Sequence, residues 1–310
     1  MRRFIVLLGL LAIVTSGCKG PAAPVEAKLD LDSDPLALLP GSALVVANLD
    51  AHALFASPSV GAQVATLANS LLPVGLVAGF EVRRDVDRIV LGVYTASGAD
   101  VAAVMSGRFD EDKITATVQA AAGAGLDRGM YAGRVTYTAG QLMVSILSPK
   151  TAVAGTGDGI RRLLERIQDK KIERAMPPWV VETLSTPGAN VALVADFTSQ
   201  PVAAAALGAI PVPWLSGMVS ARVIGNFAPP GMNVAATVTY GDPLQAQGAA
   251  EGVHAAEGWL KVLGPLLGGV APHDLEVTTD GKDLKCKFSL DDQGLASLLA
   301  LVPRFLPAPR

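Results

Sequence analysis

Histidine and cysteine, which often carry out catalysis or bind metals, number only three and two in this 310-residue sequence and form no known constellation. The three histidines, His52, His254 and His273, lack the i, i+4 spacing of a zinc-binding HExxH helix. Asp274 follows His273 directly, but adjacent side chains point in different directions and do not by themselves make a catalytic dyad. No Gly-x-Ser-x-Gly elbow offers a serine nucleophile. We therefore expect no catalytic residue, no metal site, no cofactor and no enzymatic activity.

Two short motifs resemble binding loops but fail in detail. The Gly-Thr-Gly-Asp-Gly run at 155–159 lacks the Gly-Lys-Ser/Thr of a phosphate loop and the glycine spacing of a dinucleotide fingerprint. We interpret it as a tight turn in which Asp158 is the N-cap of the next helix. The Asp-x-Asp-x-Asp run at 30–34 begins like a calcium loop, but Pro35 and Gly41 stand where an EF-hand needs glycine and a bidentate glutamate. That run is interpreted as part of a charged tether.

Cys18 is the residue for which the sequence predicts a modification. Two arginines, a short uncharged run at 4–14 and small residues before Cys18 have the layout of a secretory signal. The run is too short for a permanent span, which needs about 20 apolar residues. Ser16-Gly17-Cys18 resembles the lipobox of bacterial lipoproteins. An ordinary signal peptide with an unrelated cysteine, or a disulfide between Cys18 and Cys286, are the alternatives.

The resemblance to lipoproteins implies a processing route and an address. Cleavage would fall between Gly17 and Cys18, and Cys18 would carry a diacylglycerol on its sulfur and an acyl chain such as palmitate on its new amino group. Several acyl chains give stable membrane attachment without a transmembrane helix. Lys19 in place of aspartate favours the outer membrane, with the body facing the periplasm or the cell surface. Cys286 would then be unpaired, and the alternating pattern around it predicts a buried structural thiol on the apolar face of a strand.

Composition excludes one class of partner. Removal of residues 1–17 takes away two of the 25 basic residues and leaves 23 against 28 acidic residues, so the mature chain has a net charge of −5. No basic domain remains for nucleic acid. Half of the residues are hydrophobic and 17% are charged, which is enough for one large or two medium-sized cores.

The chain repeats itself after the signal. Pro-Gly before a strand at 45–49 recurs before 193–197, and residues 90–103 align without a gap with residues 223–236, with Gly92 matching Gly225. The Thr-x-Gly turn at 138–140 and its following strand match 279–281 and the strand at 284–290. These matches predict a signal peptide at 1–17, a lipidated flexible tether at 18–34, and two similar units at 35–174 and 175–310.

Each unit is expected to have the order βαββαββα. In the first, strands are expected near 43–49, 88–95, 100–107, 131–138 and 141–147, and helices near 58–72, 110–122 and 158–170. Hairpins at 97–98 and 139–140 and an N-cap at Asp110 support these limits. The predicted class is α+β, with mainly antiparallel sheets and helices packed on one face. On this architecture, residues 35–306 resemble uncharacterised bacterial envelope lipoproteins built from a duplicated α+β unit, a group that implies no known activity.

The function expected from these observations is binding or scaffolding in the cell envelope, with the membrane as one partner through the anchor. A protein partner is one possibility. The alternative is a carrier of lipids or other apolar ligands, which rests on two apolar, proline-containing segments at 71–80 and 201–219.

Overall fold

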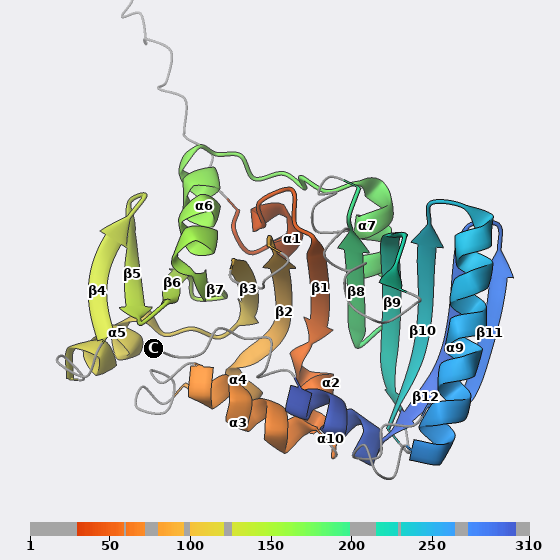
Figure 1. Ribbon diagram of the computed structural model, residues 1–310. Coiled ribbons are helices and arrows are strands. Elements are labelled where there is room, and N and C mark those ends of the chain that lie inside the picture. The colour runs from red at the N-terminus through yellow and green to blue at the C-terminus, as the bar shows by residue number, and fades with distance from the viewer. Residues whose placement is uncertain are drawn as a thin grey trace, which may run out of the picture. The chain divides into compact units, whose positions relative to one another are not determined.

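Antiparallel pairing joins both halves of the chain into one sheet. The computed structural model describes residues 30–58, 60–71, 80–95, 100–120, 126–198, 215–228, 231–263 and 272–301. Its 12-stranded sheet has the order β11-β12-β10-β9-β8-β1-β2-β3-β7-β6-β5-β4 (Figure 1). The predicted α+β class with antiparallel strands is confirmed. The expectation of a separate sheet for each unit is wrong.

The first half of the sheet has seven strands among the described residues. These are β1 (Val45–Asp50), β2 (Val86–Val93), β3 (Val101–Gly107), β4 (Leu126–Tyr131), β5 (Arg134–Ala139), β6 (Leu142–Ser148) and β7 (Thr151–Thr156). Its helices are α1 (Pro35–Leu38), α2 (Ala51–Ala56), α3 (Gly61–Leu71), α4 (Val82–Asp85), α5 (Glu111–Ala120) and α6 (Gly157–Gln168). Strands β4 and β7 and the short helices α1, α2 and α4 add to the expected set.

The second half follows α7 (Pro178–Leu184). Its strands are β8 (Val191–Asp196), β9 (Met218–Ala228), β10 (Gly231–Tyr240), β11 (His273–Asp280) and β12 (Asp283–Asp291). Its described helices are α9 (Pro243–Leu263) and α10 (Asp292–Leu301). Read outward from the centre, β8-β9-β10-β12-β11 follows the same connection order as β1-β2-β3-β7-β6, and the β4–β5 hairpin extends the first half.

The junction between the halves is the pair β1–β8. Val46 lies opposite Val194, with Val45 opposite Ala195 on one side and Ala47 opposite Leu193 on the other. Each strand would be an edge if its half stood alone, and an edge leaves backbone N–H and C=O groups unpaired. Pairing the two edges satisfies these groups, which is the physical reason for one sheet in place of two.

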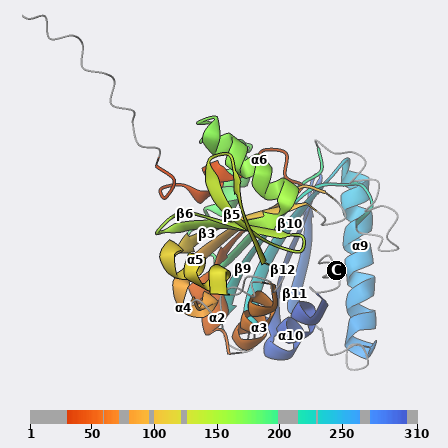
Figure 2. The same ribbon diagram turned by 90° about the vertical axis from the view of Figure 1, so that its left-hand side faces the viewer.

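Helices cover both faces of the first half, which corrects the expectation of helices on one face. Met105 of β3 packs in one cluster with Ala51 and Phe55 of α2 and Ile114 of α5. Successive strand residues point to opposite faces, so Val104 points away from that cluster, to the side where α1 and α6 contact β3. We call these sides the α2 face and the α6 face (Figure 2).

Helix α6 shows how sequence periodicity sets the packing. The predicted stripe of Ile160, Leu163, Leu164 and Ile167 is buried as expected. Asp158 is not the N-cap: Thr156 precedes the helix, and Asp158 lies in its first turn, where a carboxylate favours the helix dipole. The other predicted cap, Asp110, is confirmed, because its carboxylate accepts a hydrogen bond of 3.1 Å from the Lys113 amide.

The glycines at 155–159 have a packing role. A Cβ on Gly155 or Gly159 would lie 2.2 or 2.3 Å from the carbonyl oxygen of Val101, so only glycine lets β7 and α6 approach β3 this closely. The resemblance to a phosphate loop therefore has a structural explanation.

The folded body begins at Leu31, inside the range predicted as tether. Leu31 is buried, and the Thr151 hydroxyl donates to Asp32 Oδ1 at 2.7 Å. Arg174 Nε donates to Asp34 Oδ2 at 2.6 Å. These contacts, together with buried Leu36 of α1, fix residues that composition alone assigned to a flexible segment.

Candidate functional site

The second half of the sheet leaves one face without a described helix. Helices α9 and α10 pack on even-numbered residues of β12: Leu284 and Cys286 lie in the α9 cluster, and Leu290 lies in the α10 cluster. Odd-numbered residues of β12 therefore point to the opposite side, which continues the α6 face. We call this side of β9, β10, β11 and β12 the open face. Helix α7 borders it, where Arg222 of β9 lies 5.1 Å from the ring centre of Trp179.

Strand register arranges the open face in cross-strand rows. One row contains Asn226, Asn233 and Ser289, which are direct neighbours on β9, β10 and β12. The next row contains Ile224, Ala235, Lys287 and Glu276, again direct neighbours across four strands. Further rows are rich in polar and charged side chains, namely Arg222, Thr237, Lys285 and Thr278, then Ser220, Thr239 and Asp283.

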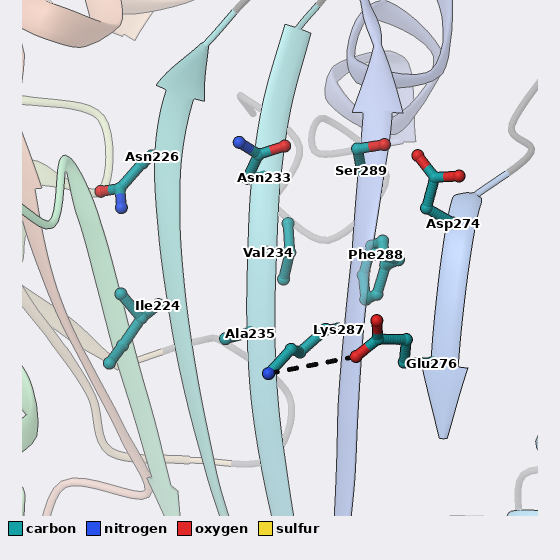
Figure 3. Close-up of a pocket in the computed structure, with 10 residues that line it drawn as sticks. All are labelled: Ile224, Asn226, Asn233, Val234, Ala235, Asp274, Glu276, Lys287, Phe288 and Ser289. Carbon is teal, nitrogen blue, oxygen red and sulfur yellow. Dashed lines mark ion pairs between the residues drawn. The ribbon is translucent and has the colours of Figure 1, made fainter. Parts of the chain in front are cut away.

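The first two rows surround a shallow hollow of about 310 Å³ (Figure 3). In the close-up, Asn233, Ser289 and Asp274 follow one another along one side, with Lys287 and Glu276 below them. The residues that line the hollow are Ile224, Asn226, Asn233, Val234, Ala235, Asp274, Glu276, Lys287, Phe288 and Ser289. Polar side chains from four strands thus converge around a small apolar floor.

A bulge in β11 shapes the edge of the hollow. His273 lies opposite Ser289 and Glu276 opposite Lys287, so residues 274 and 275 share one position of β12. Asp274 has a φ of 52°, in the left-handed region that aspartate tolerates better than most residues. A bulge re-aims side chains and interrupts pairing at a sheet edge. Here it adds the Asp274 carboxylate to the hollow.

Opposite charges on the open face balance one another closely. Lys287 Nζ lies 4.0 Å from Glu276 Oε2, and Lys285 Nζ lies 2.7 Å from Asp280 Oδ2. The hydrogen bond from Lys285 lowers the pKa of the Asp280 carboxyl, and Asp280 in turn raises the pKa of Lys285. The hollow itself holds two carboxylates and one ammonium group. It is therefore mildly acidic, and the amides of Asn226 and Asn233 and the hydroxyl of Ser289 add neutral hydrogen-bonding groups.

The residues singled out from sequence do not gather at this hollow. Gly17 and Cys18, the predicted cleavage and lipidation positions, lie outside the described residues. His52 pairs with Asp87 at 2.7 Å, and His254 lies 4.0 Å from Glu257. His273, on the β11 edge, lies 3.4 Å from Asp291. The three histidines belong to separate elements, each beside its own carboxylate.

Cys286 lies on β12, half-buried against the cluster formed by Tyr240 and α9. Burial raises the pKa of the Cys286 thiol, which lowers its thiolate fraction and its reactivity. Burial likewise raises the pKa of Tyr240 to about 12. Cys286 is thus half-buried where the sequence predicts a buried thiol, and its environment fits a structural role. Its predicted alternative partner, Cys18, lies outside the described residues.

A second polar cluster binds α6 to the sheet. Arg162 forms an ion pair of 2.6 Å with Asp100 and lies 4.6 Å from the ring centre of Tyr94. The Tyr94 hydroxyl donates to the carbonyl oxygen of Pro40, and burial raises the pKa of Tyr94. Arg166 donates to the carbonyl oxygen of Ala37. These contacts connect α1, α6 and β2, so we assign them a structural role.

Sequence reasoning missed the lining residues of the hollow. The available signal was the alternation of polar with apolar residues along β9, β10 and β12, which is typical of a strand with one solvated face. In β12 this alternation marks the apolar side that carries Cys286, but it does not show which side chains of neighbouring strands lie together. The convergence of Asn226, Asn233, Asp274 and Ser289 follows from strand register, and no spacing motif connects them.

Among the described residues, no helix is long and apolar enough to cross a membrane. Within the same residues, no group of three or more histidine, cysteine, aspartate or glutamate side chains could hold a metal ion.

The fold resembles a solved structure, although the sequence matches no protein family model and no curated protein. One similar protein is TP0453, of which three crystal forms match. Form I gives a TM-score of 0.56 at 11% identity and covers 88% of this chain and 98% of that chain. Form III gives 0.55 at 13% identity, with 86% and 98% covered. Form IV gives 0.53 at 12% identity, with 86% and 96% covered. At this identity the similarity shows a shared fold.

Proposed function

We propose that this protein is a lipid-anchored component of the bacterial cell envelope that binds a partner, without catalysis, through its open face. The contrast between the halves is the observation that carries the proposal. Val90, Val104 and Val153 form a buried row on the α6 face of the first half, whereas Ile224, Ala235 and Lys287 form the row at the matching strands of the second. Helices cover the first row and no described helix covers the second.

The anchor is proposed from the sequence. Cys18 after Ser16-Gly17 supplies the lipidation position, and Lys19 favours the outer membrane. A non-catalytic role is supported by the separation of the three histidines, which share no site with one another.

The anchor is tested with a Cys18→Ala variant of the full-length precursor. Wild-type protein should incorporate labelled palmitate and sediment with membranes, because several acyl chains give stable attachment. The variant should carry no label and leave the membrane fraction. Equal labelling of both proteins, or a Cys18–Cys286 disulfide in the wild type, would contradict the anchor.

The open face is tested with a photo-crosslinking amino acid at Ala235, in cells that express the protein. A matched control carries the same amino acid at Asp158, an exposed position of α6. Adducts specific to Ala235 would support the proposed surface. Equal adduct patterns at the two positions, or none at Ala235, would contradict it.

We also propose that the two halves arose by duplication. The shared connection order of β1-β2-β3-β7-β6 and β8-β9-β10-β12-β11 supports this, as does the match of Gly92 with Gly225. Two details depart from the sequence alignment. First, Val93 pairs with Val101, and the alignment would therefore pair Asn226 with Val234, but Asn226 pairs with Asn233, one residue earlier. Second, β12 has the position of β7 in the sheet order, although the alignment matched the sequence of β12 with that of β6.

The alternative role as an apolar carrier stays a prediction. Residues 72–79 and 201–214, which form most of its two apolar segments, lie outside the described residues. Mass spectrometry of protein purified without detergent would support this role if a lipid co-purifies.

A further inference from the structure

We infer that the hollow on the open face binds a neutral, polyhydroxylated ligand, a glycan chain or its oligosaccharide units. This inference rests on the proposed function and names the chemistry of the ligand. It begins with the hydrogen-bonding groups that the hollow presents. Asn226 and Asn233 each carry an amide that can donate and accept, Ser289 carries a hydroxyl, and Asp274 and Glu276 carry carboxylates that accept.

Several of these groups have capacity to spare. Within the described residues, neither the Asn233 amide nor the Asp274 carboxylate has a hydrogen-bond partner. Asn226 uses its carbonyl oxygen to accept from the Asn190 amide at 3.2 Å, which orients the side chain. The Ser289 hydroxyl has only a long contact of 3.4 Å to the carbonyl oxygen of His273. A ligand could therefore exchange water for hydrogen bonds without breaking strong contacts in the protein.

Charge argues against an anionic ligand. Asp274 and Glu276 line the hollow against a single ammonium group, that of Lys287, which already faces Glu276. A phosphate, a nucleic acid or an acidic peptide would meet two carboxylates, and like charges repel. A polyol carries no charge, and its hydroxyl groups donate well to carboxylates and amide oxygens.

Backbone pairing argues against an added peptide strand in the hollow. Strands β9, β10 and β12 are each paired on both sides, so a ligand over them meets side chains. Peptide recognition by strand addition needs a free edge, because main-chain hydrogen bonds supply the affinity. Polar lining also disfavours a lipid, which would leave buried groups unpaired at a cost.

The apolar floor completes the match. Ile224 and Ala235 are direct cross-strand neighbours between the polar rows. A sugar ring presents C–H groups on its faces and hydroxyl groups at its rim. Ile224 and Ala235 can contact the ring face while Asn233 and Asp274 bind the rim.

Isothermal titration of the full mature chain tests the inference. The probes are chitotetraose, cellotetraose and maltotetraose, with inorganic phosphate and tetraglycine as probes of the competing ligand chemistries. At least one sugar should bind. Asn233→Ala should weaken its binding roughly tenfold, the effect of about one lost hydrogen bond. Asp274→Gly should do the same, and glycine accepts the left-handed backbone at this position. Thr278→Ala, exposed on β11 of the same face but outside the hollow, should bind like wild type.

Three results would overturn the inference: no binding of any sugar, sugar binding unaffected by Asn233→Ala and Asp274→Gly, or binding of phosphate or tetraglycine alone. Unchanged thermal unfolding of each variant shows that folding is intact. If no sugar binds while the crosslinker at Ala235 still captures a protein, this inference fails and the proposed function stands.

Discussion

The two halves of the sheet share a strand order but differ in what their α6 face meets. In the first half, the row Val90, Val104 and Val153 is at most 1% exposed, and α6 packs over β3 and β7. In the second half, Ala235 and Lys287 of the corresponding row are exposed. The order of strands therefore does not decide whether a face is covered. Side-chain polarity does, because a helix over Asn233, Lys285 and Lys287 would bury groups that need water.

The largest expected effect is a difference between the two halves in how much stability is lost when one side chain on the α6 face is shortened. Leu163→Ala removes a side chain with no exposed surface and should lower the free energy of unfolding by about 3 kcal/mol, since it leaves a cavity. Ile224→Ala on the open face should cost less than about 1 kcal/mol. Urea denaturation measures both. If both variants lose the same free energy of unfolding, the open face is covered in the folded protein, and the two halves do not differ in the way described.

A second contrast concerns how closely helices approach the sheet. Gly159→Ala should lower the free energy of unfolding by about 1–3 kcal/mol, because the new methyl group would meet the Val101 carbonyl. Its control, Gly248→Ala in α9, places a methyl group in open space and should stabilise by about 0.5–1 kcal/mol through helix propensity. Thermal unfolding distinguishes the signs, and a destabilising Gly248→Ala would show that this position of α9 is not open to solvent.

The third prediction concerns how the buried carboxylate of Asp85 makes stability depend on pH. Asp85, 10% exposed at its side chain, accepts hydrogen bonds from Arg84 and from the Glu81 amide. The Arg84 hydrogen bond is the main cause of a lowered Asp85 pKa. Its stabilisation is complete above the ordinary aspartate pKa of about 3.9 and is lost as pH falls through the lowered value. Asp85→Asn should lower the free energy of unfolding by about 1 kcal/mol at neutral pH. In denaturation measured against pH, its stability should also fall less steeply than that of the wild type below about pH 4. If the variant loses stability with falling pH as steeply as the wild type, the Asp85 carboxylate does not contribute to the pH dependence.

The smallest effect is expected on the open face. Asp280 and Lys285 form a close ion pair, but the side chains are 74% and 46% exposed. Water screens exposed pairs, which rarely contribute measurably to stability. The Lys285→Ala variant should therefore have the same midpoint of urea unfolding as the wild type. A clear loss would indicate that this pair is shielded in the folded protein.

The sequence predicted the parts that depend on local periodicity. The α6 stripe followed from 3.6-residue spacing, and five strands of the first half were placed within a few residues. It missed β7 as a separate strand, because Thr151–Thr156 consists of small residues without polar alternation. It also ended the tether too late, since the burial of Leu31 depends on β7, more than a hundred residues away.

The candidate site could not be found in this way. Asn226, Asn233, Asp274 and Ser289 come from four strands, and only the register brings them together. Local patterns report which face of a strand is polar, but not which helix will cover it. The joining of β1 to β8 is likewise a property of distant segments. The lipidation of Cys18 stays a prediction.

The β1–β8 pair has a consequence for how the chain matures. Val45 finds its partner Ala195 150 residues further along the chain. Pairings this distant form slowly, because a long loop must close before they contribute. If the chain emerges from a translocon amino end first, β1 waits with an exposed backbone until β8 arrives. During that interval another chain could occupy its edge. If the protein is exported as proposed, its export should therefore depend on holding chaperones more than its modest size suggests.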